Sequence, residues 1–350
     1  MKSGNKAVYP LIYIILFAML FFAVVLSAGT GSANIGFSSS LKILLSRIPL
    51  LEHLVNTDGM PSQYFTIIFS IRLPRIAASI LVGMGLSVCG VVFQGMFRNP
   101  MADPYVLGIS SGAVLGAALA FVTGTQYALF SLGLVPLYAF AGALMATTAV
   151  YLIAQRGGKL VTNTLILSGI AIGFLCSSII SIIIIASREQ AHRILFWTMG
   201  SMTGSSWNTV LVMLPFILAG SLVLLLNAGN INILSTGDES AVSLGVNAGT
   251  LKKLLLLTAS MVTAISVCFC GTIGFVGLII PHAVRYLTGP DHKKLMPVSA
   301  LAGGIFLLLC DTAARTLFAP QEIPIGVITS LFGVPFFISL LLRSKRRTLA

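Results

Sequence analysis

Long uncharged apolar stretches recur from one end of the chain to the other, and they leave very few folds open to it. A helix that crosses the hydrocarbon core of a bilayer needs about 20 predominantly apolar residues. The run LIYIILFAMLFFAVVL at residues 11–26 is typical of such a helix, and it lacks the alternating polarity of a β-barrel strand. We therefore predict ten membrane-spanning helices, at residues 8–28, 76–97, 105–124, 129–154, 164–186, 207–228, 254–271, 272–287, 296–319 and 323–342.

The composition supports an all-α, polytopic membrane protein that forms one domain over residues 1–350. Of the 350 residues, 57% are hydrophobic and 9% are charged, whereas a soluble domain carries roughly 25% charged residues. No water-soluble core could absorb so much apolar sequence. The first apolar run is too long for a cleaved signal peptide and leads directly into more membrane, so we expect it to be retained as a helix.

The net charge of +12 follows the two sides of a membrane rather than a nucleic-acid surface. Cytoplasmic segments of membrane proteins carry an excess of lysine and arginine. With the N-terminus inside and ten crossings, fourteen of the 21 basic residues fall on the cytoplasmic side, which predicts two cytoplasmic termini and no nucleic-acid partner. The fourteen are Lys2, Lys6, Arg98, Arg156, Lys159, Lys252, Lys253, Arg285, Lys293, Lys294, Arg343, Lys345, Arg346 and Arg347.

Three polar segments lie between the predicted helices. Residues 29–71 form the longest of them and are external under this topology. Residues 187–206 are external too, and their length and their glycine and serine content favour an interfacial or re-entrant helix, with Trp197 and Trp207 at the membrane surface. Residues 229–252 are cytoplasmic.

The cytoplasmic segment contains a short predicted helix from Asp238 to Leu244. Thr236 stands near its N-terminal cap, and the acids Asp238 and Glu239 lie in its first turn, where the helix dipole favours negative charge. A plain connection between two spans would not need a capped helix. This segment is therefore a candidate functional element.

Two parts of the sequence resemble each other. Residues 86–116 and 265–304 both begin with Ser-Val-Cys, continue into a glycine-rich helix end, contain a proline and finish in a helix of small residues. If the first unit starts inward and the second outward, the chain contains an inverted repeat, which is a common design among transporters.

Few side chains could carry chemistry. Asp311 and Arg315 stand four residues apart on one predicted helix and can pair with each other. The five cysteines lie in apolar spans and the four histidines are scattered, so we expect no metal site. The sequence contains no Walker A, HExxH or GxSxG motif, which predicts that this chain is not an enzyme and that any ATP hydrolysis occurs on another chain.

Two other classes of protein stay open on these grounds. A secondary transporter can also have inverted repeats, but it would need coupling residues in the middle of the membrane, where the one acid, Asp311, has a cationic neighbour. An intramembrane enzyme or a purely structural subunit is the second alternative. The enzyme would need a catalytic cluster, and the structural subunit would leave the cytoplasmic helix unexplained.

Five motifs in a fixed order identify a known family. They are RLPRIAASILVGMGLSVCGVVFQGMFRNPMADPYVLGISSGA (72–113), LSGIAIG (167–173), GDESAVSLGV (237–246), GTIGFVGLIIPHAVR (271–285) and EIPIGVITSLFGVPFF (322–337). With these motifs the chain closely resembles the FecCD-type permeases, the membrane subunits of binding-protein-dependent importers for siderophores, haem and cobalamin. The resemblance covers nearly the whole chain beyond residue 60.

The resemblance implies a type II permease of an ATP-binding-cassette importer in the inner membrane. Such a permease is a homodimer of ten-helix subunits with the translocation path at the dimer axis. Two ATPase subunits below it hold ATP and Mg²⁺, and a substrate-binding protein docks from outside, so this chain itself would bind no cofactor. The cargo would be an iron chelate, a siderophore or haem, with cobalamin as the alternative, because selectivity resides mostly in the binding protein.

The resemblance also assigns roles to residues by motif position. Outward-facing arginines that would engage acidic residues of the binding protein are Arg72, Arg75 and Arg315, although helix-end snorkelling is the alternative for the first two. The coupling helix that would seat in the ATPase includes Asp238, Glu239, Ser240, Ala241, Leu244 and Gly245. The cytoplasmic gate would be formed by Asn99, Met101, Thr162 and Asn163. The weakly polar wall of the path would include Ser168, Gly169, Ser177 and Ser178.

Overall fold

The computed structural model describes residues 8–31, 33, 35–49, 53, 55–57, 59–124, 133–156 and 159–348. Lys2 and Lys6, two of the fourteen basic residues above, lie outside these ranges, as do parts of the predicted external segment 29–71. The helices and strands are α1 (Val8–Gly29), α2 (Phe37–Leu45), α3 (Ser62–Thr66), the π-helix η2 (Ile67–Arg72), α4 (Leu73–Phe97), the 3₁₀ helix η3 (Pro104–Leu107), α5 (Ile109–Thr123), α6 (Leu134–Ala154), β1 (Gln155–Arg156), β2 (Lys159–Leu160), α7 (Thr162–Ala186), α8 (Arg188–Thr198), α9 (Trp207–Leu226), α10 (Ala228–Leu234), α11 (Asp238–Ser243), α12 (Ala248–Cys270), α13 (Val276–Thr288), α14 (His292–Thr316) and α15 (Ile325–Thr348).

Each of the ten predicted segments contains one of the described helices, and the all-α prediction is confirmed. Seven helical stretches are long and apolar enough to cross a membrane, and α5, α13 and the apolar part of α15 are shorter. The predicted start of one span at residue 272 is wrong. The backbone of Phe275 is left-handed, with a φ of 71°, and α13 begins only after it.

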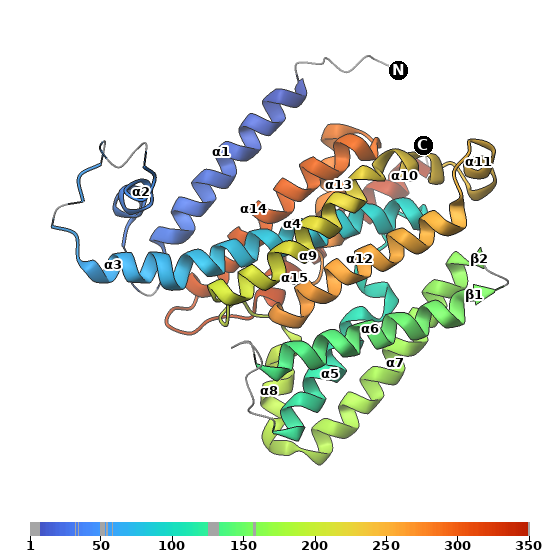
Figure 1. Ribbon diagram of the computed structural model, residues 1–350, viewed down its shortest axis with the longest axis horizontal. Helices are drawn as coiled ribbons and strands as arrows, with labels where there is room; N and C mark the ends of the chain where they lie inside the picture. Colours follow the sequence, from blue (N-terminus) through green and yellow to red (C-terminus); the bar gives the residue numbers. More distant parts are fainter. Residues whose placement is uncertain are drawn as a thin grey trace.

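Helix α4 lies at the centre of the larger group of helices (Figure 1), where it packs against α9, α12, α13 and α14. Glycines allow this close packing. A Cβ atom on Gly90 would collide with the carbonyl oxygen of Gly277 in α13, and one on Gly83 would collide with that of Gly303 in α14. Because lipid provides little hydrophobic drive between helices, direct backbone contact through small residues is what holds α4 in place.

Helices α5, α6, α7 and α8 form a second group beside the first (Figure 1). The same principle applies to α5 and α6, since a Cβ atom on Gly112 would collide with the carbonyl oxygen of Gly142. Gly112 therefore lies on the face of α5 that packs against α6. At the other side of α5, the short helix η3 lies against the first turns of α7.

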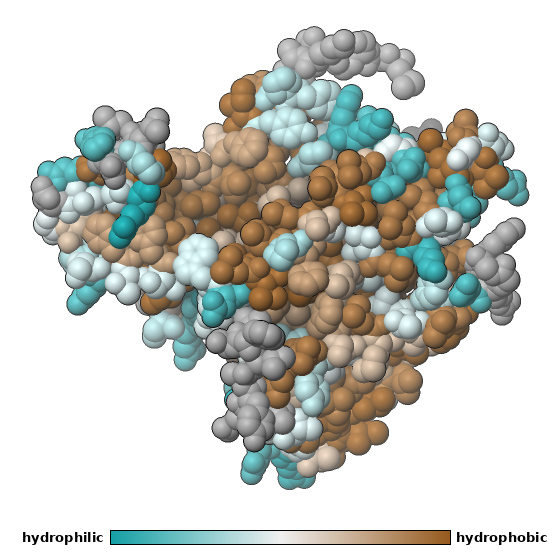
Figure 2. All heavy atoms as spheres, viewed as in Figure 1, coloured by the Kyte–Doolittle hydropathy of each residue, from teal (hydrophilic) through white to brown (hydrophobic). Residues whose placement is uncertain are grey.

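The surface of the molecule separates into an apolar middle and two polar ends. Figure 2 shows hydrophobic side chains over the central helices of the visible face and hydrophilic ones toward the α2–α3 end and the α10–α11 end. The π-helix η2 leads directly from α3 into α4, and the indole nitrogen of Trp207 donates to the carbonyl of Phe69 in η2, 2.9 Å away. The end with α2 and α3 is the predicted outer side.

The opposite end carries α10, α11 and the two-residue strands β1 and β2, which pair antiparallel. The predicted short helix at Asp238 is confirmed as α11, but its predicted cap is wrong. Gly237 occupies the N-cap position without a side-chain hydrogen bond, and the Thr236 hydroxyl donates instead to the carbonyl of Ile233. The outer segment 187–206 contains α8, while its interfacial position and the inverted repeat stay predictions.

Candidate functional site

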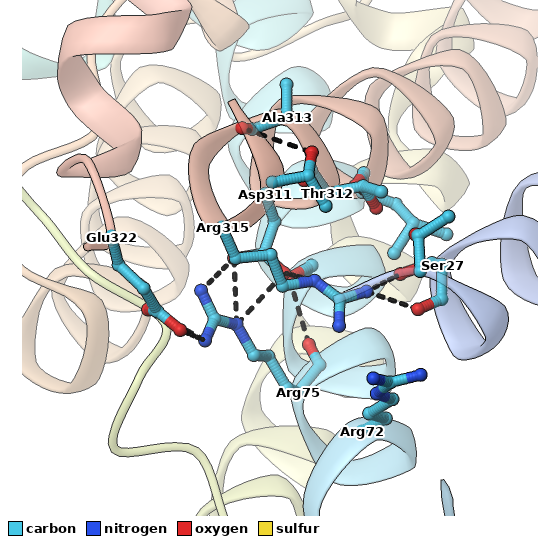
Figure 3. Close-up of polar contacts among 12 residues, drawn as sticks. Ser27, Arg72, Arg75, Asp311, Thr312, Ala313, Arg315 and Glu322 are labelled. Carbon is cyan, nitrogen blue, oxygen red and sulfur yellow. Dashed lines mark hydrogen bonds and ion pairs between the residues drawn. The ribbon is translucent and has the colours of Figure 1, made fainter. Parts of the chain in front are cut away.

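A buried cluster of charged side chains joins α4 and α14 near their outer ends (Figure 3). Asp311 is fully buried in α14, and its carboxylate accepts from the Nε and Nη2 atoms of Arg75 in α4 at 2.9–3.0 Å. The predicted partner, Arg315, lies 3.9 Å from this carboxylate. The principal ion pair is therefore between helices, and spacing within one helix could not reveal it.

Glu322 completes the cluster from the segment between α14 and α15. One of its carboxylate oxygens lies 3.0 Å from Nη1 of Arg75, and the other accepts from the hydroxyl of Thr203, 2.8 Å away. Its side chain is partly exposed, whereas that of Asp311 is not. Glu322 is thus the member of the cluster that a partner molecule can reach first.

The other two arginines point toward the last turn of α1. Arg315 donates to the carbonyl and the hydroxyl of Ser27 (Figure 3), and Arg72 donates to the carbonyls of Ala28 and Ala33. Only 5% of Arg72 and 7% of Arg315 is exposed. The expectation that these arginines face outward is therefore wrong, and so is the snorkelling alternative for Arg72.

The charges of this cluster are nearly balanced by helix α1. Three arginines face two carboxylates, which leaves one positive charge in excess. The C-terminus of a helix carries roughly half a negative charge and several carbonyls without partners. Because the excess cations donate to the last carbonyls of α1, the cluster also fixes α1 to α4 and α14.

At the end predicted to be cytoplasmic, α11 divides into a buried and an exposed side. Ala241 is completely buried against the body of the protein. Glu239, Ser240 and Gly245 are exposed, and so is Leu244, to 64%. Four of the six residues assigned to coupling are therefore available to a partner, while Ala241 anchors the helix.

The remaining coupling residue, Asp238, holds α11 to two transmembrane helices. Its carboxylate lies 2.5 Å from Nζ of Lys252 in α12 and 3.6 Å from Nη2 of Arg98. Arg98 caps the end of α4 with a left-handed backbone, φ 52°. Sequence reasoning placed both basic residues on the cytoplasmic side but did not predict that they share one carboxylate.

A groove with a volume of about 450 Å³ lies beside α11. Its walls combine exposed side chains of α11 with the first turn of α12 and with β2. The lining residues are Leu160, Asp238, Glu239, Val242, Asn247, Ala248, Gly249 and Lys252. The groove has apolar and charged walls, as a seat for a protein segment requires.

The four predicted gate residues lie on two separate segments. Asn99 and Met101 follow α4, and the Asn99 side chain accepts from the Met101 backbone at 2.9 Å. Thr162 and Asn163 are the first residues of α7. Within the described part of the chain no hydrogen bond joins the two segments, so the gate stays a prediction.

The predicted path residues of α7 fall on two different faces. Ser168 and Gly169 are buried, and a Cβ atom on Gly169 would collide with the carbonyl oxygen of Val106 in η3. These two residues pack within the subunit and line no open surface. Ser177 and Ser178 are exposed, with the Ser178 hydroxyl bonded to the carbonyl of Phe174.

Sequence reasoning missed a pocket of about 470 Å³, lined in part by hydroxyl groups, where two breaks in the helical backbone meet. The hydroxyl of Tyr105, in η3, donates to the carbonyl of Ile273 and accepts from its amide. In a membrane, non-helical backbone is stable only inside protein or beside a water-filled cavity. The pocket is lined by Tyr105, Ser110, Thr198, Met199, Thr272, Gly274, Gly326, Val327 and Ser330.

Comparison with known proteins gives consistent matches over most of the chain. The model of the FecCD transport family matches residues 19–343. The cobalamin import system permease of Halobacterium salinarum is 47% identical over 291 residues, which are 83% of this chain and 77% of that protein. The hemin transport system permease of Yersinia pestis is 40% identical over 326 residues, 91% of this chain and 92% of that protein.

A solved structure agrees with the fold. It is described as an inward-facing conformation of a metal-chelate type ABC transporter, and it superimposes with a TM-score of 0.82. It is 31% identical in sequence and covers 96% of this chain and 100% of its own. The similarity in sequence and in helix arrangement therefore extends over nearly the whole molecule.

Proposed function

Since the chain belongs to the FecCD transport family, whose members are permease subunits of ATP-binding-cassette importers, we propose that it moves an iron chelate inward across the cell membrane as half of a homodimer. Two ATPase subunits bind ATP and Mg²⁺ below the dimer, and a binding protein delivers the cargo from outside. Both chain termini then lie in the cytoplasm, in agreement with the excess of basic residues on that side.

The observation that carries this proposal is the exposed side of α11. Val242 and Leu244 are more than 60% exposed at the polar cytoplasmic end of the molecule, beside the groove between α11 and α12. Exposed apolar side chains with a polar rim mark surfaces that bind another protein. An ATPase that binds α11 would displace the helix when the ATPase closes on ATP.

Two cargo classes have support from relatives. The hemin permease at 40% identity and the iron-citrate permeases of Bacillus subtilis, at 34% and 35%, favour an iron chelate. The 47% identity to a cobalamin permease favours a corrinoid as the second candidate. The hydroxyl-lined pocket near Tyr105 would present weakly polar groups to either cargo without holding it tightly.

We expect the binding protein to dock on the outer arginine cluster by exchanging one ion pair for another, and not by contact with a free, exposed arginine. The carboxylate of Glu322 already occupies Nη1 of Arg75 at 3.0 Å. A carboxylate of the binding protein would take the place of Glu322 on Arg75, because charge-assisted arginine–carboxylate bonds are strong and geometrically similar. Arg72 and Arg315 would support this site from within by fixing α1.

The test is reconstitution with the ATPase encoded beside this chain and with its binding protein. We expect a complex of two permeases and two ATPases in native mass spectrometry. In proteoliposomes it should take up one of three labelled cargoes, a ferric siderophore, haem or cobalamin, only when ATP is present. Uptake without any ATPase would instead identify a secondary transporter.

A pair of variants tests the role of α11 directly. Leu244→Asp adds a charge to the exposed apolar side of α11 and should weaken ATPase binding by roughly tenfold or more, as expected for an interface anchor. Thr250→Asp adds the same charge to an exposed position of α12 outside the groove and serves as the control. Equal binding by both variants would exclude α11 as the ATPase seat.

A further inference from the structure

The cytoplasmic start of α14 is joined to α10, the helix that precedes α11, by one asparagine side chain. The Nδ2 atom of Asn232 donates to the carboxylate of Asp291, the N-cap of α14, at 2.7 Å. The Oδ1 atom of Asn232 accepts from the backbone amide of His292 at 2.9 Å. Both ends of the amide are therefore bound to the first residues of α14.

The orientation of this amide follows from the charge on Asp291. Burial disfavours the charged carboxylate, but the hydrogen bonds from Asn232 and from the amide of Lys293 hold the pKa of Asp291 below its usual range. A charged carboxylate only accepts hydrogen bonds. The NH₂ group of Asn232 must therefore face Asp291, and its oxygen must face His292.

The tautomer of His292 follows in turn. Its Nδ1 atom lies 2.7 Å from Oδ1 of Asn232, an atom that carries no proton, so the proton of this hydrogen bond lies on Nδ1. The other ring nitrogen, Nε2, has no hydrogen-bond partner, and 4% of the residue is exposed. The arrangement thus requires a donor at the Nδ1 position and uses Nε2 only for packing.

The ring of His292 packs directly on the backbone of α4. A Cβ atom on Gly95, close to the end of α4, would lie 2.6 Å from Nε2 of His292 and 2.6 Å from Cγ2 of Ile231. His292 of α14 and Ile231 of α10 therefore both pack against α4 at Gly95. A movement of α10 relative to this point cannot leave α4 and α14 undisturbed, since packed interiors do not deform continuously.

The residue before Gly95 in α4 extends the connection to α13. The side-chain nitrogen of Gln94 lies 3.2 Å from the carbonyl of Leu278, and its oxygen accepts from Nη2 of Arg285 at 3.2 Å. On the other side, α10 continues into α11 through a turn of three residues, in which the amide of Gly237 donates to the carbonyl of Leu234. Hydrogen bonds and direct packing together thus connect the coupling segment to α14, α4 and α13.

We propose that Asn232 and His292 are positioning residues that transmit the movement of α11 to α14 and α4. This inference rests on the proposed function, in which an ATPase moves α11. The chain itself joins α11 to α10 and to α12, and the ion pairs of Asp238 reach Lys252 in α12 and Arg98 at the end of α4. The amide of Asn232 supplies the connection to α14 that neither of these provides.

The experiment compares variants of the reconstituted complex by the number of cargo molecules taken up per ATP hydrolysed. His292→Gln places a polar group near Nε2 and removes the donor at Nδ1, and Asn232→Leu removes the amide. Each should lower this ratio by roughly tenfold, within the usual range of coupling between sites, while ATP hydrolysis continues. His292→Asn keeps a donor near the Nδ1 position and should retain most of the ratio.

Asn230→Leu is the matched control, because Asn230 is exposed on the same helix and its side chain bonds to Asn227 rather than to α14. The double variant Asn232→Leu/His292→Gln should lose no more than either single variant. Additive losses, or equal ratios in His292→Gln and His292→Asn, would overturn the inference. If either single variant fails to assemble, the comparison of His292→Asn with Asn230→Leu tests the inference instead. A low ratio of uptake to hydrolysis in His292→Asn, with an unchanged ratio in Asn230→Leu, would also overturn the inference.

The two levels of failure are distinguishable. A wild-type complex that shows no ATP-dependent uptake of any cargo would contradict the proposed function. A wild-type complex that transports, with variants that keep its ratio of uptake to hydrolysis, would contradict only the role of Asn232 and His292.

Discussion

Helices α4 and α7 have the same length, 25 residues, and both are strongly apolar, but they occupy opposite environments. In the apolar part of the stretch Ser62–Phe97, which contains α4, 83% of the residues are buried, against 11% in the apolar part of α7. Hydrophobicity therefore identifies a span and says nothing about its position in the bundle. The difference lies in the small residues, which let neighbouring backbones touch α4 along its whole length.

The exposed side of α7 has a consequence for assembly. Helices α5, α6 and α8 and the short helix η3 cover one side of it, and Leu167, Phe174 and Ile185 are among its exposed side chains. In the proposed homodimer this side is available to lipid or to the second subunit. Four substitutions sharpen the contrast with α4, and they differ in expected effect.

The largest effect is expected from Asp311→Asn, which leaves Arg75 of α4 without its buried partner. Removing one partner of a buried ion pair costs about 3–5 kcal/mol. The free energy of unfolding, measured by titrating the detergent-solubilised protein with a denaturing detergent, should fall by this amount. Glu322→Gln is the control at the exposed edge of the same cluster, where a loss of about 0–1 kcal/mol is expected. Equal losses would show that burial does not set the strength of these contacts.

Gly90→Ala should have the next largest effect. The new methyl group would collide with the backbone of α13 at Gly277, and neither backbone can move without separating the helices. Overpacking of this kind costs about 1–3 kcal/mol. The same unfolding titration measures it, and an unchanged stability would mean that α4 and α13 are less closely packed than described.

Phe174→Ala removes a large side chain from α7 that is 71% exposed. Because the subunit alone gains little from this side chain, its free energy of unfolding should change by less than about 0.5 kcal/mol. The fraction of dimers in liposomes, measured by single-molecule photobleaching, should nevertheless fall if the second subunit covers this face. An unchanged fraction would assign the face to lipid.

Gly173→Ala should have a small effect on the isolated subunit, of opposite sign to that of Gly90→Ala. The nearest atom to the new methyl group is the hydroxyl of Ser111 at 3.6 Å, an ordinary contact. Alanine favours a helix over glycine by roughly 0.5–1 kcal/mol, so the subunit should become slightly more stable. A loss of stability comparable to that of Gly90→Ala would remove the distinction between the two helices.

The sequence alone was sufficient to predict the spans and α11, because both predictions depend on local patterns. Apolar length predicted ten helices, and the acids at Asp238 and Glu239 predicted the start of the cytoplasmic helix. The cap was mispredicted because Gly237 can begin a helix without a side-chain bond, an option that a search for capping side chains does not consider.

The partners of the charged residues could not be predicted in this way. Asp311 had an arginine four residues away, and the spacing favoured that pair, yet the shorter bonds come from Arg75, 236 residues earlier. Likewise, Ser168 and Ser177 look alike in sequence, but one is buried and the other is exposed. Such differences depend on which helices become neighbours, and that is decided by long-range packing.

The hydrogen bonds from the arginines to the last turn of α1 have a consequence for biosynthesis. Ser27 and Arg315 are separated by 288 positions, so the ribosome completes α1 long before its partner emerges. Until then, the terminal carbonyls of α1 must find water or headgroups at the membrane surface. Helix α1 is thus synthesised long before Arg315 can fix it in place, and a nascent chain truncated before Arg315 should leave α1 free to slide or exchange.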